Sequence, residues 1–263
     1  MASVWLAVGC GTIDPSKHSG EAGEAGQAAV AGSQGDAGSA GSSGGEAGGP
    51  PTDGGAAAGG GGAPPALEPL LPWNVGNRWT YRITKNGVVT EKTTVVGEVE
   101  LVGGTGPNAD LMANHVSTDK GVKDHTESWQ ARSLSAPDRV VRFREQAFSV
   151  ATGKLQAEVF YDPEKLHVDG TPERTIAGAT WLEEYAETTL AVGLSPVSHD
   201  VSERWRVIAD GETLEVPAGT FDGVIHLRKV GNSTKDYWYL RGVGKLKETG
   251  TQTEELTDYT LVP

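Results

Sequence analysis

The chain has 263 residues, a formal net charge of −13 and only 37% hydrophobic residues. The acidic balance argues against nucleic-acid binding, because phosphate neutralisation needs a basic surface. The single Cys permits no internal disulfide, and no run of about 20 apolar residues could form a membrane-spanning helix. These totals average two unlike regions: 19 of the 37 Gly residues lie within 1–66, whereas six of the seven Trp residues lie within 67–263.

Residues 1–10 resemble the end of a bacterial lipoprotein signal peptide. A short apolar stretch leads to Ala7-Val8-Gly9-Cys10, which resembles a lipobox with Ala where the pattern prefers Leu. The resemblance implies diacylation of the Cys10 thiol, cleavage before it and anchoring in a membrane, and Gly11 resembles the pattern of outer-membrane sorting. A basic n-region is missing, so we expect the true start to lie upstream. The alternative is an ordinary N-terminus that carries one stray Cys.

Residues 11–66 consist mainly of Gly, Ala and Ser with scattered acids, and they show no hydrophobic periodicity. Such a composition cannot bury enough apolar surface to form a core. We therefore predict a disordered linker with a root-mean-square span of about 40 Å. Gly41-Ser42-Ser43-Gly44-Gly45 fits the G-x-S-x-G template, but the strand and helix that a nucleophile elbow requires cannot form there.

Residues 67–263 are predicted to form one β-domain, because short runs rich in Val, Thr, Tyr and Trp alternate with turn residues. Asn86-Gly87 predicts a hairpin that places Arg82 opposite Glu91. Asp210-Gly211 predicts a second hairpin, and 181–190 is the best helix candidate. The expected fold is all-β, or β with one minor helix: a curved antiparallel sheet, half-barrel or barrel-like. Further strands are expected at 79–85, 111–117, 125–131, 139–146, 155–161, 224–230, 237–240, 245–248 and 259–262; the second hairpin would pair Val207 with Leu214 and Trp205 with Val216.

Two further segments have turn chemistry of their own. In the 216–221 segment, Pro217 presets φ for a type I turn and Gly219 can adopt the left-handed conformation. Gly242 and Gly244 lack a Cβ, which allows a close backbone approach or a bend. We expect a tight chain reversal at the first segment and close packing at the second.

Three segments of the β-domain have a distinctive sequence: Trp73-Asn74-Val75-Gly76-Asn77-Arg78-Trp79-Thr80-Tyr81, Val216-Pro217-Ala218-Gly219-Thr220-Phe221, and Tyr237-Trp238-Tyr239 followed by Gly242-Val243-Gly244-Lys245. They resemble a broad group of secreted or lipidated bacterial β-domains, most of them without assigned activity. The resemblance spans essentially all of 67–263, although 96–200 matches only as generic strand sequence. It implies an envelope protein and a curved half-barrel similar to periplasmic lipoprotein carriers, and no catalytic residue comes with it.

The six His residues form no H-E-x-x-H motif and no close pair, so the sequence offers no template for a metal site or a cofactor. His199-Asp200 and Asp124-His125 could each orient an imidazole for general-base chemistry. A curved sheet could instead turn several aromatic rings toward one ligand, or the rings could simply fill the core. The candidate ligand-facing residues are Trp79, Tyr81, Trp129, Trp205, Trp238 and Tyr239.

We therefore expect a lipid-anchored protein of the cell envelope, attached through Cys10 and sorted to the outer membrane. Its β-domain is expected to bind an apolar ligand, a glycan or other envelope polymer, or a protein partner, without catalysis. Two alternatives stay open: an envelope hydrolase that uses His199 or His125, and a purely structural envelope component. The sequence does not indicate the oligomeric state.

Overall fold

The computed structural model describes residues 67–121, 124–133 and 136–263. The expected signal segment 1–10 and the expected linker 11–66 lie outside these residues. Among the described residues, no helix has the length and apolarity needed to cross a membrane. The strands are β1 (Arg78–Lys85), β2 (Val88–Leu101), β3 (Met112–Asp119), β4 (Asp124–Arg132), β5 (Arg139–Ser149), β6 (Leu155–Asp169), β7 (Thr180–Ala191), β8 (Val197–Val216), β9 (Gly219–Val230), β10 (Thr234–Leu240), β11 (Gly244–Thr249) and β12 (Thr253–Thr260).

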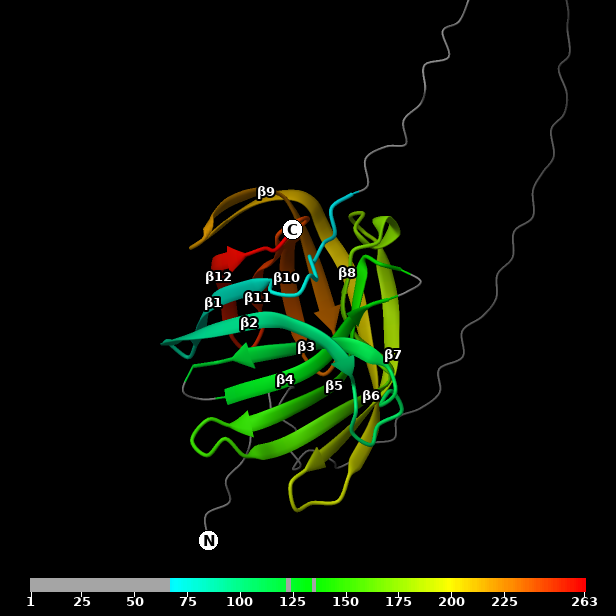
Figure 1. The fold of residues 1–263 in the computed structure, drawn as a ribbon. Coiled ribbons are helices and arrows are strands. Elements are labelled where there is room, and N and C mark those ends of the chain that lie inside the picture. The colour runs from blue at the N-terminus through cyan, green and yellow to red at the C-terminus, as the bar shows by residue number, and fades with distance from the viewer. Residues whose placement is uncertain (1–66, 122–123, 134–135) are drawn as a thin grey trace, which may run out of the picture. The chain divides into compact units, whose positions relative to one another are not determined.

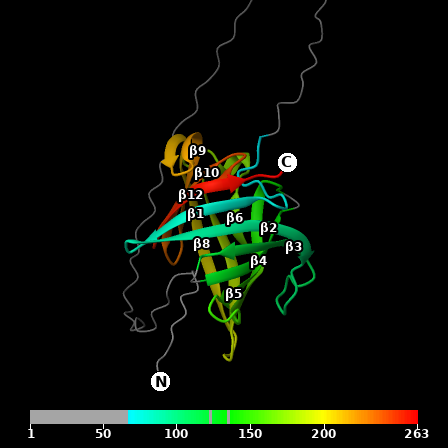
Figure 2. The ribbon, with the colours of Figure 1, turned by 60° about the vertical axis from the view of Figure 1, so that its left-hand side comes forward.

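The strands form one closed antiparallel barrel in which neighbours in sequence are neighbours in space (Figure 1). The barrel closes because β1 pairs with both β2 and β12, so the first and last strands lie side by side (Figure 2). The expected all-β, barrel-like fold is therefore confirmed. The only helical element in the described part is a single 3₁₀ turn, Pro172–Arg174.

The helix predicted for 181–190 is wrong, because this segment lies within β7. Trp181 and Tyr185 are both buried, and they lie an even number of residues apart. This spacing is typical of a strand, in which alternate side chains face the barrel interior. Glu183 and Glu187 share that face. The interior of this barrel therefore accepts carboxylates as well as rings.

The hairpin predicted at Asp210-Gly211 is also wrong. Strand β8 continues through both residues and turns back only after Val216. The pairing with β9 shifts register around Asp210, and Gly211 has a positive φ of 91°. The glycine therefore serves a β-bulge within the strand and not the turn that was predicted. Val207 therefore pairs with Leu227 rather than Leu214.

Two other turn predictions are confirmed. Asn86 and Gly87 both have positive φ, 49° and 77°, as a type I′ hairpin requires, and Arg82 lies opposite Glu91. The side chain of Arg82 bonds instead to Glu255 on the other neighbouring strand, with Nη2 2.7 Å from Oε2. Pro217 occupies the tight turn between β8 and β9, whose flanking residues pair directly.

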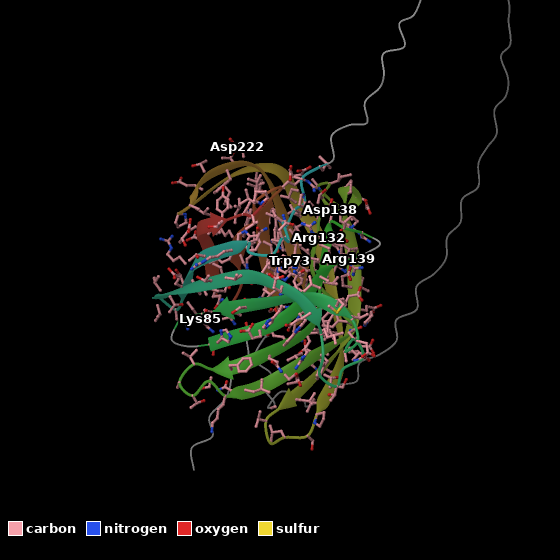
Figure 3. All side chains as sticks on the ribbon, viewed as in Figure 1. Trp73, Lys85, Arg132, Asp138, Arg139 and Asp222 are labelled. Carbon is pink, nitrogen blue, oxygen red and sulfur yellow. The ribbon has the colours of Figure 1, made fainter. Side chains whose placement is uncertain are left out.

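A segment before β1 closes one end of the barrel, and we call residues 67–77 the plug. Leu70 and Leu71 are buried in the main core, and the Trp73 ring stacks on the Trp79 ring with a centroid distance of 6.3 Å. Trp73 lies among the side chains that fill this end of the barrel (Figure 3). Arg241 fastens the plug from outside by donating to the carbonyl oxygen of Glu68 at 3.0 Å.

Gly244 provides the close approach expected of the Gly242-Val243-Gly244 segment. Its φ is 106°, and a Cβ at this position would lie 2.9 Å from Leu71 Cδ1 and 3.1 Å from Trp79 Nε1. The Trp79 indole donates to the carbonyl oxygen of Val243 at 2.7 Å. The missing side chain therefore lets the start of β11 pack directly against the plug and β1.

Candidate functional site

The inward-facing side chains of the barrel change from apolar next to the plug to charged two residues further along the strands. In the first layer, Trp205, Leu227, Leu246 and Leu256 are at most 1% exposed and belong to one apolar cluster. Two residues further along the same strands, about 7 Å away, the inward side chains are charged. A barrel of twelve strands is wider than the eight-stranded kind that short apolar side chains fill, so longer side chains meet across it. The charged positions are Glu203, Lys229, Glu248 and Glu254.

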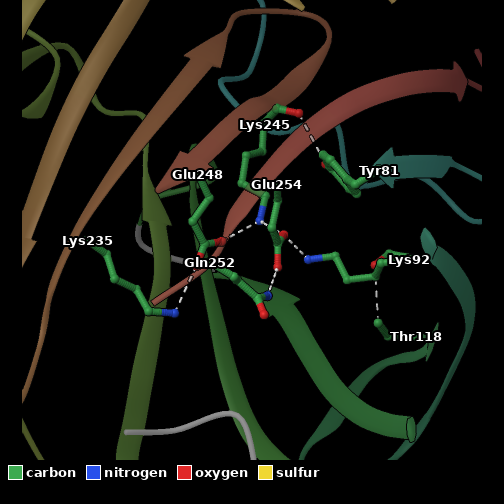
Figure 4. A network of polar contacts seen from close by, with 9 residues as sticks. Tyr81, Lys92, Thr118, Lys235, Lys245, Glu248, Gln252 and Glu254 are labelled. Carbon is green, nitrogen blue, oxygen red and sulfur yellow. Dashed lines mark hydrogen bonds and ion pairs between the residues drawn. The ribbon is translucent and has the colours of Figure 1, made fainter. Parts of the chain in front are cut away.

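Lys245 lies at the centre of a buried polar network that we call the lumen cluster (Figure 4). Its ammonium donates to Glu248 Oε2 at 2.6 Å and to Glu254 Oε2 at 2.9 Å. Glu248 also accepts from Lys235 at 2.8 Å, and Glu254 accepts from Lys92. The cluster joins β2, β10, β11 and β12 through charge-assisted hydrogen bonds, which are stronger than neutral ones.

The lumen cluster holds its carboxylates ionised. Burial alone would raise the pKa of Glu248, but Lys245 and Lys235 lower it to about 2. Burial likewise opposes ionisation of Glu254, and Lys245 and Lys92 hold its pKa well below the usual value. Burial lowers the pKa of Lys92 to about 8, although Glu254 opposes this shift. Each of the two buried carboxylates therefore bonds to two of the three ammonium groups, with Lys245 shared between them.

A second set of ion pairs continues around the interior wall on β6 to β9. Lys229 lies 2.7 Å from Glu203, and Lys165 lies 3.8 Å from Glu187. His199 Nε2 is 3.9 Å from Glu187 Oε1, with a side chain 38% exposed. These side chains stabilise the wall and supply charge along the interior.

The six aromatic residues singled out in the sequence do not share one surface. Trp79, Tyr81, Trp205 and Tyr239 lie inside the barrel and are at most 4% exposed, so their rings are used in packing the core. The other two lie on the outer face, each against a His ring. The centroid distances are 5.1 Å for Trp129 with His115 and 4.2 Å for Trp238 with His226.

A concavity of about 450 Å³ lies on the outer face at the end of β3, β4 and β5, and we call it the outer-face site. Register places Asp119, His125 and Phe148 directly across from one another on the three strands. Glu127, two residues along β4 from His125, faces the same side. The concavity is lined by Asp119, Gly121, His125, Glu127, Phe148, Ser149, Val150 and Gly153.

Carboxylates hold both ring nitrogens of His125. Nδ1 lies 2.6 Å from Asp119 Oδ1, and Nε2 contacts Glu127 Oε1. Partial burial alone would lower the pKa of His125, but the hydrogen bonds to Asp119 and Glu127 raise it. The arrangement favours the imidazolium, which donates from both nitrogens, and the Phe148 ring lies 5.7 Å away in a tilted orientation.

Beside this site, the side chains of His115, Trp129 and Arg144 contact one another across β3, β4 and β5. The Arg144 guanidinium lies 4.1 Å from the Trp129 ring centroid, while His115 stacks on that ring from the opposite neighbouring strand. The Trp129 indole donates to Glu100 Oε1 at 2.9 Å. Arg144 also bonds to the carbonyl oxygen of Val102, so the segment after β2 covers this row. A ligand on the outer face would meet His125 and Phe148 rather than Trp129.

The two His-acid pairs proposed from adjacency are not formed as predicted. Neighbouring residues on a strand point to opposite faces, so Asp200 points away from His199, whose acidic neighbour is Glu187. For the same reason Asp124 does not pair with His125. Sequence reasoning missed Asp119, Glu127 and Phe148; only the two-residue spacing from His125 to Glu127 was a usable signal.

In the part of the chain that the structure describes, no group of three or more His, Cys, Asp or Glu side chains is arranged to hold a metal ion. In the outer-face site, Glu127 lies between the imidazoles of His115 and His125, with His115 Nε2 2.7 Å from Glu127 Oε2. What this site offers chemically is hydrogen bonding: one imidazolium and two carboxylates beside an aromatic ring.

Comparison with known proteins finds a likeness only among solved structures. No family model matches the chain, and no curated protein matches it. A presumed exported protein with a YmcC-like fold from Bacteroides fragilis is 11% identical, with a TM-score of 0.44. A presumed lipoprotein from Parabacteroides distasonis is 12% identical, with a TM-score of 0.39. Each likeness covers 74% of this chain and 100% of the other, and these low TM-scores carry no conclusion about function.

Proposed function

We propose that this chain is a lipoprotein of the cell envelope, anchored through Cys10 and displayed on the 11–66 segment. Its barrel binds an envelope polymer without catalysis. The anchor rests on the lipobox-like Ala7-Val8-Gly9-Cys10 sequence followed by a Gly-rich, acidic spacer. More than one acyl chain on one Cys gives stable membrane attachment, whereas a single chain is marginal.

The binding part of the proposal rests on the outer-face site. Planar polar groups in a row can exchange hydrogen bonds with the hydroxyl groups of a sugar, and an aromatic ring can pack against its apolar C–H face. His125 holds Asp119 and Glu127 in place, the remaining lone pairs of these two carboxylates can accept from ligand hydroxyl groups, and Phe148 supplies the ring, all within one open concavity. An open site suits a polymer segment, because a chain can enter and leave without being enclosed. A polyhydroxylated glycan is the ligand that fits best.

Catalysis receives little support from the same geometry. A general base needs a ring nitrogen free to accept a proton from the reacting group. His125 directs both nitrogens to carboxylates, and the nearest acidic group to His199 is 3.9 Å away. We therefore favour binding over hydrolysis.

The binding test titrates the full chain with glycan fragments released from its own envelope. We expect Phe148→Ala to weaken binding about tenfold or more, because the loss of one central aromatic contact has effects of that size. The matched control is Asp236→Asn, which alters another outer-face His–Asp pair, 2.9 Å apart. That control should bind like the parent. Equal weakening by both variants, or no binding of any envelope glycan by the parent chain, would refute the proposal.

The anchoring test compares the parent chain with Cys10→Ser in its own cells. We expect the parent in the membrane fraction, with a mass increase on the Cys10 peptide, and the variant in the soluble fraction. An unmodified Met1 peptide from membrane-extracted protein would contradict lipidation. This outcome is independent of the glycan titration, so the two parts of the proposal can fail separately.

A further inference from the structure

The end of the β7–β8 hairpin exposes an unusual concentration of apolar side chains, and we call residues 191–197 the apolar tip. Of the large apolar side chains in the described residues, the three most exposed are Leu194 at 73%, Val192 at 66% and Val197 at 63%. All three lie within six consecutive positions. Apolar residues exposed singly need no explanation, but a contiguous group marks a contact surface.

The apolar tip also contains no charged residue, although the chain as a whole is acidic. No Asp, Glu, Lys, Arg or His occurs from Thr188 to Ser198, although residues 67–263 contain 29 acidic and 21 basic residues, a net charge of −8. Asp, Glu, Lys and Arg are among the residues most often exposed on protein surfaces. Their absence over eleven residues leaves a surface that loses little hydration when it enters an apolar medium.

The backbone of the apolar tip is held in a defined shape. Leu194 donates to the carbonyl oxygen of Ala191 at 3.0 Å, and Val192 donates to that of Gln156 at 2.9 Å. Gly193 has a φ of 81°, which allows the tight reversal. The side chains of Val192 and Leu194 are therefore presented without a cost for ordering the loop, which favours binding.

We propose that the apolar tip inserts into the surface of a lipid bilayer and orients the barrel on the membrane. Hairpin ends with uncharged apolar residues gain free energy in proportion to the apolar area that they bury in the interface. The end of the β7–β8 hairpin lies at the opposite end of the barrel from the cyan segment that forms the plug (Figures 1 and 2). An insertion there gives the protein a second membrane contact, distinct from the proposed anchor at Cys10.

The segment between Cys10 and the barrel is long enough for the proposed anchor and the apolar tip to reach the same membrane. Fifty-six residues separate Cys10 from Leu67, and such a chain can span up to about 190 Å. Strand β8, which has 20 residues and is the longest in the barrel, has a contour of about 66 Å. The length of the chain therefore allows the anchor and the tip to contact the same bilayer.

The test uses the full-length Cys10→Ser chain, so that only the tip can mediate membrane contact. Flotation with phosphatidylcholine vesicles should recover this chain with the lipid. Leu194→Glu should weaken recovery about tenfold or more, because burying one Leu is worth at least that factor. The matched control is Val89→Glu, at a position 60% exposed near the end of the β1–β2 hairpin, and its recovery should be unchanged.

Vesicle charge provides a second measurement. Because the barrel region carries −8, vesicles with half phosphatidylglycerol should recover less protein than neutral vesicles at low ionic strength. If Leu194→Glu lowers the melting temperature, Val192→Ser replaces it. Flotation that is absent, or equally reduced by Val89→Glu, overturns the proposal. So does a dimer in solution that Leu194→Glu dissociates while vesicle recovery stays at background, because the tip would then contact a second copy.

Discussion

The barrel interior is filled by two layers of different chemistry: apolar side chains next to the plug and charged side chains further along the strands. Next to the plug, Trp205 stacks on Trp181 at a centroid distance of 6.0 Å and on Tyr237 at 5.6 Å. One step further along, Lys245 joins Glu248 and Glu254. The first layer gains stability from apolar burial, which tolerates some variation in partners, whereas in the second each buried charge depends on a partner of opposite charge.

The difference shows what a wide barrel requires. Rings and aliphatic side chains fill the end that the plug narrows, because the plug supplies Leu70, Leu71 and Trp73 from outside the wall. Without a plug, the opposite walls lie further apart, and long flexible side chains are needed to bridge them. Charged groups at the ends of such chains then pair across the interior, so the layer stays polar although it is largely buried.

Removing a ring from the apolar layer should have the largest effect. Trp205 is 1% exposed, and Trp205→Ala should lower the free energy of unfolding by about 3–5 kcal/mol, measured by urea denaturation. Leu182→Ala, in the neighbouring strand but 49% exposed, should change it by less than about 1 kcal/mol. Similar losses in both variants would contradict the assignment of the plug end as the main core.

Lys245→Met tests whether the second layer depends on charge compensation. It leaves Glu248 and Glu254 facing each other without their shared ammonium, and we expect a loss of about 3 kcal/mol in urea denaturation. Lys247→Met, on the same strand but in a more exposed pair with Glu255, where the side chains are 24% and 19% exposed, should cost about 0.5 kcal/mol. Adding Glu254→Gln to Lys245→Met should recover part of the loss; a further loss would show that the carboxylates do not repel each other.

Gly244→Ala tests the contact between the plug and the apolar layer. The added methyl would lie 2.9 Å from Leu71 Cδ1, at a φ of 106° that Ala resists, so we expect a loss of about 2 kcal/mol. Gly211→Ala shares the unfavourable φ, at 91°, but meets nothing within 4 Å. The difference between the two melting temperatures isolates the contact with the plug. Equal shifts would leave only backbone strain as the cause.

Acid should weaken the charged layer, with the smallest effect of the four changes. The pKa of Glu248 falls from 4.5 to about 2 on folding, so its contribution is complete above pH 4.5 and is lost as the pH falls toward 2. Glu248 alone should remove about 1 kcal/mol between pH 7 and pH 3.5. Glu248→Gln should flatten the fall in stability over this window, whereas Glu215→Gln, an exposed change, should leave it unaltered. Parallel curves for both variants would contradict the assigned role.

Local chemistry made some features predictable from the sequence. The Asn86-Gly87 hairpin follows from the positive φ that both residues tolerate, and the Pro217 turn follows from the fixed φ of proline. At Asp210-Gly211 the same kind of signal failed, because continuous pairing of β8 with β9 outweighs a local preference and a bulge can use the same glycine. The helix predicted at 181–190 failed because Glu183 and Glu187 face the interior.

The candidate site was only partly accessible to such reasoning. His125 was recognised as a titratable group, but its partners come from a neighbouring strand and from two residues along its own strand, not from the adjacent Asp124. Cross-strand register brings Asp119 and Phe148 to it, and register depends on the whole barrel. The aromatic residues Trp79 and Tyr239 were noticed for their size, which also explains why the core uses them.

The sequence by itself determined the β class and the two locally encoded turns, because strand period and turn conformations are local properties. The tertiary structure alone decided which residues face inward, how the buried charges are paired and where the outer-face site forms. These depend on contacts between residues distant in sequence: closure of β1 on β12 creates the interior, and only that interior brings Lys92 to Glu254.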